Sequence, residues 1–129
     1  MIVIDTSALV AIIRLEPEAE QFVQRMKTAR ARYLSASSYL EVFMVLAGAS
    51  ANPSPQDLDF LLFQAGVQVV PFDDVQARVA SEAFRRFGKG RHAAKLNYGD
   101  CFAYALAKVK GAPLLFKGDD FSQTDVDVA

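Results

Sequence analysis

Short apolar runs alternate with longer segments of helical periodicity along the whole chain. The runs at 2–4, 33–35, 67–70 and 114–116 are rich in β-branched and aromatic residues and predict strands, with a weaker strand at 126–128. The intervening patterns, with their Pro, Gly, Asn and Asp boundaries, predict a series of helices over 8–14, 17–27, 37–49, 55–65, 74–87 and 98–110.

The strands are continuous apolar runs rather than alternating ribbons, which is typical of a parallel sheet covered on both faces. The sequence therefore predicts an α/β protein, with a short, mainly parallel central sheet between two layers of helices. A length of 129 residues fits one domain over 1–129. In such sheets, ligands bind at the carboxyl ends of the strands, near a topological switch point.

Acidic residues stand at the ends of strands and in the first turns of helices. Asp5 follows the first strand, and Asp119 and Asp120 follow the strand at 114–116. Glu41 and Asp100 lie near the starts of the helices at 37–49 and 98–110. Because this fold brings such positions to one edge of the sheet, these carboxylates are expected to meet.

Each acid also has a purely structural explanation. Asp5 can cap the helix that follows it, although Thr6 or Ser7 could supply that cap and leave Asp5 free. Glu41 can form a capping box with Ser38. Asp100 can stabilise the start of its helix through the helix dipole, and the same explanation is sufficient for Asp57.

The surroundings of Glu41 argue against capping alone. The following residues, Val42 to Leu46, are apolar and predict a core helix, in which an unpaired carboxylate would cost several kcal/mol. Clustered carboxylates also repel one another, which a hard cation with oxygen ligands relieves. The pattern predicts a Mg²⁺ site, with Mn²⁺ as a substitute, suited to hydrolysis of a phosphodiester by a metal-activated water.

The amino-acid composition excludes several other kinds of metal site and catalytic mechanism. The single cysteine, Cys101, excludes a thiolate-rich metal site and is expected to be a buried, inert thiol. The single histidine, His92, excludes RNA cleavage by a histidine pair. No apolar run reaches the length of a membrane span, and Asp5 interrupts the apolar start where a secretory signal would continue, so a cytoplasmic protein is expected.

Positive charge is concentrated in one segment although the net charge is only −1. Arg86, Lys89 and Arg91 in this segment are expected to contact the backbone phosphates of RNA. The alternative is a solvated basic surface with no ligand.

Four segments together resemble the PIN-domain ribonucleases, and specifically the VapC-type toxins of bacterial toxin–antitoxin pairs. They read MIVIDTSALVAI, SSYLEV, FGKGRHAAKLNYGDCFAYALAK and LLFKGDDFSQTD. The resemblance covers essentially the full length and implies a single PIN domain over 1–129 with a three-layer α/β/α fold. It also implies a homodimer, inhibited by a VapB-type antitoxin whose tail would occupy the acidic groove.

The resemblance also assigns roles to individual residues. Asp5, Glu41 and Asp100 resemble the first, second and third acids of the family site. The last motif reads Gly-x-Asp-Phe in similar sequences, which favours Asp120 as the fourth acid and keeps Asp119 as the alternate. Thr6 and Ser7 resemble the hydroxyl residues of the family motif that support the first acid or a nearby water.

The sequence therefore predicts a Mg²⁺-dependent endoribonuclease. Asp5 and Asp100 would hold the metal, and Glu41 and Asp120 would orient the attacking water or support the ligands. Two alternatives stay open: a non-catalytic module that binds an antitoxin or another partner through an acidic groove, and another Mg²⁺-dependent α/β phosphoryl-transfer protein. The second fits less well, because aspartate-nucleophile phosphatases require Asp-x-Asp where this chain has Asp5-Thr6-Ser7.

Overall fold

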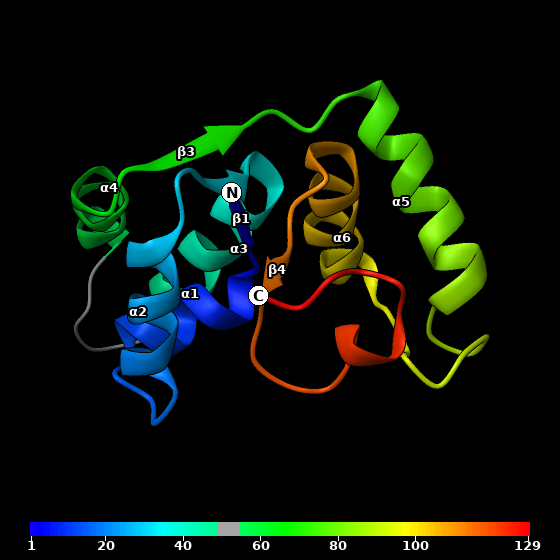
Figure 1. Cartoon of the computed structure of the whole chain (residues 1–129), viewed down its shortest axis with the longest axis horizontal. Coiled ribbons are helices and arrows are strands. Elements are labelled where there is room, and N and C mark those ends of the chain that lie inside the picture. The colour runs from blue at the N-terminus through cyan, green and yellow to red at the C-terminus, as the bar shows by residue number, and fades with distance from the viewer. Residues whose placement is uncertain (49–54) are drawn as a thin grey trace.

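The computed structural model describes residues 1–48 and 55–129 and shows strands and helices alternating along the chain (Figure 1). In order, its elements are β1 (Ile2–Ile4), α1 (Thr6–Ile13), α2 (Ala19–Thr28), β2 (Arg32–Ser35), α3 (Ala36–Ala47), α4 (Pro55–Gln64), β3 (Val67–Val70), α5 (Asp74–Phe87), α6 (Tyr98–Lys110), β4 (Leu114–Leu115) and a 3-10 turn, η1 (Phe121–Gln123).

The four strands form one parallel sheet in the order β3-β2-β1-β4. The chain runs outward from β1 through β2 to β3, and then returns to add β4 on the other side of β1. The connections therefore change direction between β1 and β4, which is the topological switch point where α/β proteins bind ligands. The predicted parallel sheet and three-layer fold are confirmed.

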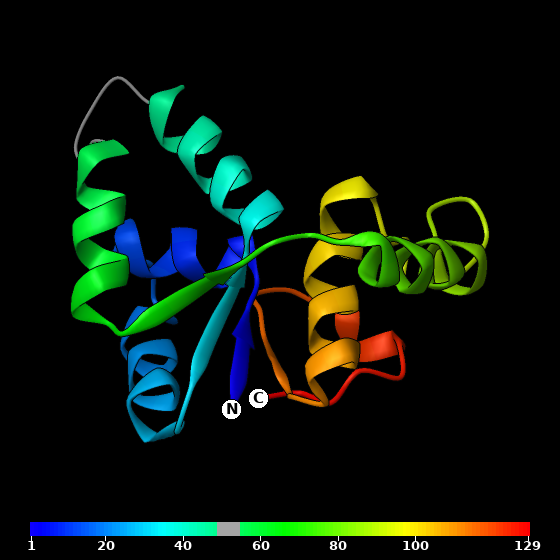
Figure 2. The same ribbon diagram turned by 90° about the horizontal axis from the view of Figure 1, so that it is seen from above.

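Helices cover both faces of the sheet and create two cores (Figure 2). Ile2 and Ile4 point into the core with α1 to α4, whereas Val3 points into the core with α5 and α6, because side chains alternate across a strand. α6 lies against the sheet, and α5 packs on the outer side of α6. Within the described ranges, no helix is both long and apolar enough to span a bilayer.

Most predicted elements match the structure, and the differences are local. The strands at 2–4 and 67–70 and the helices at 74–87 and 98–110 have the predicted bounds. Pro17 precedes α2 rather than occupying its first turn. The strand expected at 126–128 is reduced to an isolated bridge between Leu114 and Val128. Ala49 and the turn expected after it fall largely outside the described residues, at 49–54.

The prediction that α3 is a core helix is wrong. Only one stripe of the helix is buried, through Ser38, Val42 and Leu46. Leu40 and Met44 are 57% and 63% exposed. A run of apolar residues does not distinguish a helix buried all round from one with an uncovered apolar face, because both have the same sequence pattern.

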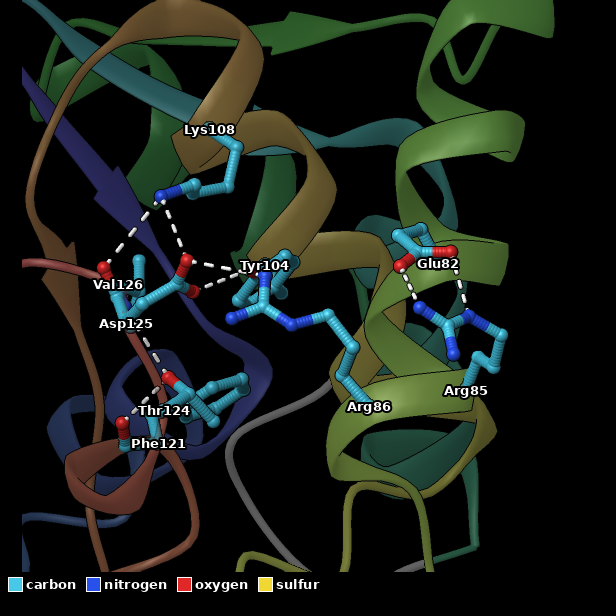
Figure 3. Close-up of polar contacts among 9 residues, drawn as sticks. All are labelled: Glu82, Arg85, Arg86, Tyr104, Lys108, Phe121, Thr124, Asp125 and Val126. Atoms are coloured by element: carbon cyan, nitrogen blue, oxygen red, sulfur yellow. Dashed lines mark hydrogen bonds and ion pairs between the residues drawn. The ribbon is translucent and has the colours of Figure 1, made fainter.

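A polar network fastens the C-terminal segment to α6 and α5 (Figure 3). The buried hydroxyl of Tyr104 donates to the Asp125 carboxylate, which also lies 3.4 Å from both Lys108 Nζ and Arg86 Nη1. Burial and the bond to Asp125 raise the pKa of Tyr104 above its ordinary value of 10, so the hydroxyl keeps its proton at neutral pH. The Tyr104 hydroxyl thus holds the C-terminal segment against α6 by donating a hydrogen bond to Asp125.

Replacement of Tyr104 by phenylalanine is expected to lower the free energy of unfolding by about 1–2 kcal/mol, because a hydrogen bond to a charged group is lost while Asp125 stays partly hydrated. Tyr39→Phe is the matched control, since its hydroxyl donates to Asp59 at 2.5 Å on the exposed surface and should contribute less than about 1 kcal/mol. Urea denaturation measures both. Equal stability losses would contradict a special role for the buried network.

Candidate functional site

Four acidic residues from distant parts of the chain come together at the switch point between β1 and β4. Asp5 ends β1, Glu41 lies on α3, Asp100 is in the first turn of α6, and Asp120 follows β4. The charges of Asp100 and Glu41 both act on Asp5, and those of Asp120 and Glu41 act on Asp100. The acids that the sequence singled out thus share one electrostatic site.

Asp5 is the most buried of these acids, with 5% of its surface exposed. Burial raises its pKa from 3.8 to about 6, the hydrogen bonds from Ser7 oppose this rise, and the charges of Asp100 and Glu41 add to it. Every neighbouring charge that perturbs the pKa of Asp5 is negative. Asp5 is therefore a buried carboxylate without a compensating positive charge among the described residues.

Asp5 also caps α1. Its Oδ2 accepts hydrogen bonds from the Ser7 backbone N–H at 2.9 Å and from the Ser7 hydroxyl at 2.6 Å. The alternative in which Thr6 or Ser7 caps the helix and frees Asp5 is therefore wrong. Capping and metal binding are compatible, however, because a carboxylate has two oxygens. Within residues 1–48 and 55–129, no hydrogen bond engages Asp5 Oδ1.

Ser7 connects the two strands that flank the site. While its hydroxyl donates to Asp5, its oxygen accepts a hydrogen bond from the Lys117 backbone N–H at 2.9 Å. Lys117 follows β4 and leads to Asp120. Thr6 is buried too, but its Oγ1 has no hydrogen-bond partner among the described residues. Of the two hydroxyls, only that of Ser7 contacts Asp5.

Like Asp5, Asp100 caps a helix, here α6, and also lies among the acids of the site. The Asn97 backbone N–H donates to Asp100 Oδ2 at 3.0 Å, and the Asp100 backbone N–H donates to Asn97 Oδ1 at 2.9 Å, which completes a capping box. Burial raises the pKa of Asp100, the bond from Asn97 opposes the rise, and the charges of Asp120 and Glu41 add to it. The cap fixes this carboxylate at the site.

Glu41 does not form the capping box expected with Ser38. The N-cap of α3 is Ser35, whose side chain accepts from the Ser37 backbone N–H at 3.3 Å. The Ser38 hydroxyl is buried and has no hydrogen-bond partner within the described part of the chain. Because α3 begins earlier than expected, Glu41 lies beyond the first turn and is available to the site.

Sequence reasoning missed Gly99, which makes room for Glu41. A Cβ atom added at Gly99 would overlap Glu41 Oε2 and would lie only 3.1 Å from both Cδ and Oε1. Glycine is unfavourable within a helix by about 1 kcal/mol relative to alanine. A glycine in the first turn of α6, directly before Asp100, was the signal in the sequence that a close approach occurs here.

The two candidates for the fourth acid differ in their surroundings. The charge of Asp120 acts on Asp100, whereas Asp119 is not among the groups that perturb either Asp5 or Asp100. The backbone carbonyl of Asp119 accepts a hydrogen bond from the Ser122 hydroxyl at 2.7 Å. The electrostatics therefore favour Asp120 over Asp119.

The basic residues expected to contact RNA lie at the end of α5 and in the loop after it. The Arg86 guanidinium is paired with Asp125 (Figure 3). It also lies 4.6 Å from the centre of the Phe87 ring. Arg91 lies 5.7 Å from the centre of the Phe84 ring. Neither of these cations, nor Lys89 between them, is among the charges that perturb Asp5 or Asp100.

The donor set suits a hard divalent cation. All four acids offer carboxylate oxygens, which Mg²⁺ and Mn²⁺ prefer, and a cation would compensate the buried charge of Asp5. In the described ranges, no three Asp, Glu, His or Cys side chains already surround one point at ligand distance. Cation binding would therefore draw the carboxylates closer together from their present positions.

Comparison with known proteins identifies the family of the chain. The family described as PIN domain matches residues 2–127. Ribonuclease VapC of Mycolicibacterium smegmatis is 52% identical over 124 residues, which cover 96% of each chain. Ribonuclease VapC30 of Mycobacterium tuberculosis is 49% identical over 124 residues, covering 96% of this chain and 95% of the relative.

Solved structures share the fold at much lower sequence identity. The VapC20 toxin of Mycobacterium tuberculosis, described as cleaving the sarcin-ricin loop, has a TM-score of 0.78 at 16% identity, with 100% of this chain and 98% of that chain covered. A toxin-antitoxin complex from Klebsiella pneumoniae also gives 0.78 at 16% identity, covering 100% and 97%. At these identities, the likeness shows the shared fold alone.

Proposed function

The chain belongs to the PIN-domain family and, within it, to the VapC ribonucleases, and on this premise we propose that it is a Mg²⁺-dependent endoribonuclease, the toxin of a VapBC-type pair. The observation that carries the proposal is the convergence of Asp5, Glu41, Asp100 and Asp120 at the switch point, where no cation among the described residues perturbs the pKa of Asp5 or Asp100. Residues 1–129 would form one PIN domain that acts on RNA in the cytoplasm.

Asp5 and Asp100 would hold the metal, with Mn²⁺ able to replace Mg²⁺, and Glu41 and Asp120 would orient the attacking water or support the ligands. When bound, the metal would polarise the scissile phosphate and make a water more acidic. Both principal acids have one oxygen engaged by the fold, Asp5 through Ser7 and Asp100 through Asn97. Each keeps a second oxygen for a ligand, so the fold orients these two carboxylates before any ion binds, and ion binding would then draw the acids together.

The only histidine takes no part in the proposed chemistry. His92 Nδ1 accepts a hydrogen bond from the Ala94 backbone N–H at 3.0 Å, and its ring packs edge-to-face on Phe87. Attack by water, rather than by the 2′-hydroxyl with histidine catalysis, would leave a 5′-phosphate and a 3′-hydroxyl. Thr6 would support Asp5 or a nearby water, since its buried hydroxyl has no partner in the described part of the chain.

Cationic side chains would guide the RNA backbone toward the acids. Lys89 and Arg91 are the better placed for this, because Arg86 is already paired with Asp125 and would have to exchange one anion for another. Contacts of this kind position a substrate without reading its sequence.

The proposed partners follow from family membership. The chain would form a homodimer and bind a VapB-type antitoxin, whose tail would occupy the acidic groove. The Klebsiella pneumoniae relative in fold is described as a toxin-antitoxin complex, which supports such a partner. The acids support it too, because basic side chains of an inhibitor would find uncompensated negative charge there.

Metal removal tests the function directly. The purified protein is expected to cleave single-stranded RNA with Mg²⁺ or Mn²⁺ present, and to lose all cleavage when EDTA removes the cation, since the carboxylates would then repel the phosphate. Readdition of Mg²⁺ should restore cleavage, and sequencing of the product ends should show 5′-phosphates. Intact RNA at every metal concentration, together with tight antitoxin binding, would instead favour the non-catalytic module.

A further inference from the structure

Asp120 differs from Asp5 and Asp100 in how its carboxylate is held. Asp5 caps α1, and Asp100 takes part in the capping box of α6. Asp120 directly precedes η1, but its side chain makes no capping hydrogen bond with any described residue. Its position therefore depends on the backbone of the segment 117–120, in which every residue is exposed.

Lys117 ties this segment to α1 and to the connection that follows α1. Its backbone N–H donates to the Ser7 hydroxyl at 2.9 Å, and Ser7 in turn donates to Asp5. Its Nζ lies 2.6 Å from Glu16 Oε1 and 3.0 Å from Glu18 Oε2, between α1 and α2. Two attachments fix both the place and the direction of the segment, which one attachment would not.

We propose that Lys117 is a positioning residue, whose pairing with Glu16 and Glu18 holds Asp120 in a fixed place relative to Asp5, so that both can serve one metal ion. The inference rests on the proposed ribonuclease function and adds a residue outside the four acids. Lys117 acts through the backbone that it anchors, because its charge is not among those that perturb the pKa of Asp5 or Asp100.

The pairing of Lys117 is more than a simple surface ion pair. One ammonium joins two carboxylates, and such a network is the case in which surface charges contribute measurably. Glu18 Oε2 is shielded from solvent, and within the described part of the chain it contacts only the Lys117 ammonium. Without Lys117, this oxygen would stay buried without a counter-charge, which is costly. Lys117 is thus held where it lies.

The two glutamates also argue against a direct contact between Lys117 and RNA. To reach a phosphate, the ammonium would have to leave Glu16 and Glu18 together. The bonds to Glu16 and then to Glu18 raise the pKa of Lys117, so the ammonium and its ion pairs persist at neutral pH. Loss of Lys117 is therefore expected to change the metal site and not the affinity for RNA.

Metal binding without RNA provides the first test. Calorimetric titration with MnCl₂ should show that Lys117→Ala binds Mn²⁺ about 10- to 100-fold more weakly than the parent, the range for loss of a group that supports metal ligands. Lys117→Arg, which can still pair with both glutamates, should restore most of the affinity. Lys27→Ala is the matched control, because it removes an exposed lysine from α2 and should leave the affinity unchanged.

A double-mutant cycle tests whether the glutamates carry the effect. In a background of Glu16→Gln and Glu18→Gln, the additional loss of Mn²⁺ affinity caused by Lys117→Ala should be small. Urea denaturation shows whether each variant is folded. If Lys117→Ala is not, Lys117→Gln takes its place and should also bind Mn²⁺ less tightly than the parent.

Kinetics distinguish positioning from substrate binding. With Mg²⁺ at a fixed, subsaturating concentration, Lys117→Ala should lower kcat on single-stranded RNA and leave KM and its salt dependence unchanged. If KM rises instead, and the logarithmic salt slope of RNA binding falls by about 0.7, Lys117 contacts a phosphate and the proposal is overturned.

The remaining outcomes separate this proposal from the ribonuclease function. Equal Mn²⁺ affinity of the parent and Lys117→Ala would overturn the positioning role, as would a parent that binds no Mn²⁺. If Lys117→Ala weakens Mn²⁺ binding but the parent cuts no RNA, the positioning role stands, and it is the ribonuclease function that fails.

Discussion

Replacement of Asp5 by asparagine should abolish most RNA cleavage and yet stabilise the metal-free protein. Loss of a partner that only supports a metal ligand typically reduces activity 10- to 100-fold, so loss of a ligand itself should cost at least roughly 100-fold. Asparagine can keep the cap on α1, because its side-chain oxygen can accept the bond from the Ser7 backbone N–H.

The gain in stability follows from the raised pKa of Asp5. Since the folded protein holds this proton more tightly than the unfolded chain, ionisation of Asp5 opposes folding. The ionised Asp5 carboxylate therefore destabilises the folded protein by its full amount above about pH 6 and not at all below about pH 4. The reason is that its pKa is 3.8 in the unfolded chain and about 6 in the folded protein. The difference corresponds to a stabilisation of up to roughly 3 kcal/mol for Asp5→Asn at pH 7 without metal.

Two measurements check this prediction. Urea denaturation with EDTA present should show the advantage of Asp5→Asn at pH 7 and its disappearance near pH 4, and RNA cleavage should be measured with Mg²⁺. Asp127→Asn is the control, because this acid is exposed and is not among the groups that perturb the pKa of Asp5 or Asp100. Both its stability and its cleavage activity should stay at the parental level. Lower stability of metal-free Asp5→Asn would show that Asp5 is structural only.

Replacement of Gly99 by alanine is the second change with a large expected effect. The new Cβ would overlap Glu41 Oε2 and would press on Cδ and Oε1 at 3.1 Å, so the carboxylate must move away. Cleavage should fall by about 10- to 100-fold, as for other changes that displace a supporting group at a metal site. Stability should hold or rise, since alanine favours a helix by about 1 kcal/mol over glycine.

Gly48→Ala is the control for this prediction. Gly48 ends α3, the helix that carries Glu41, and a Cβ there would meet its nearest atoms at an ordinary 3.5 Å. Cleavage by this variant should match that of the parent. A double-mutant cycle then identifies the target of Gly99→Ala: in a Glu41→Ala background, the additional loss should be small. A full additional loss would place the effect elsewhere than on Glu41.

Local patterns in the sequence were sufficient for most elements of the fold. The strand at 67–70 has the predicted bounds because its apolar run is ended by Gly66 and Pro71. α6 begins and ends as predicted because Asn97 caps its start and Gly111 adopts the left-handed conformation after its end. These signals act over a few residues, so they can be read without knowing the fold.

The chain by itself also determined which acids to consider, because Asp5, Glu41 and Asp100 stand at strand ends or near helix starts. Only the tertiary structure decided how each is used. It showed that Asp5 caps α1 while it faces other acids, that Asp120 rather than Asp119 acts on Asp100, and that Gly99 adjoins Glu41. Such relations depend on distances between residues far apart in the chain, and these distances exist only after the strands and helices have packed.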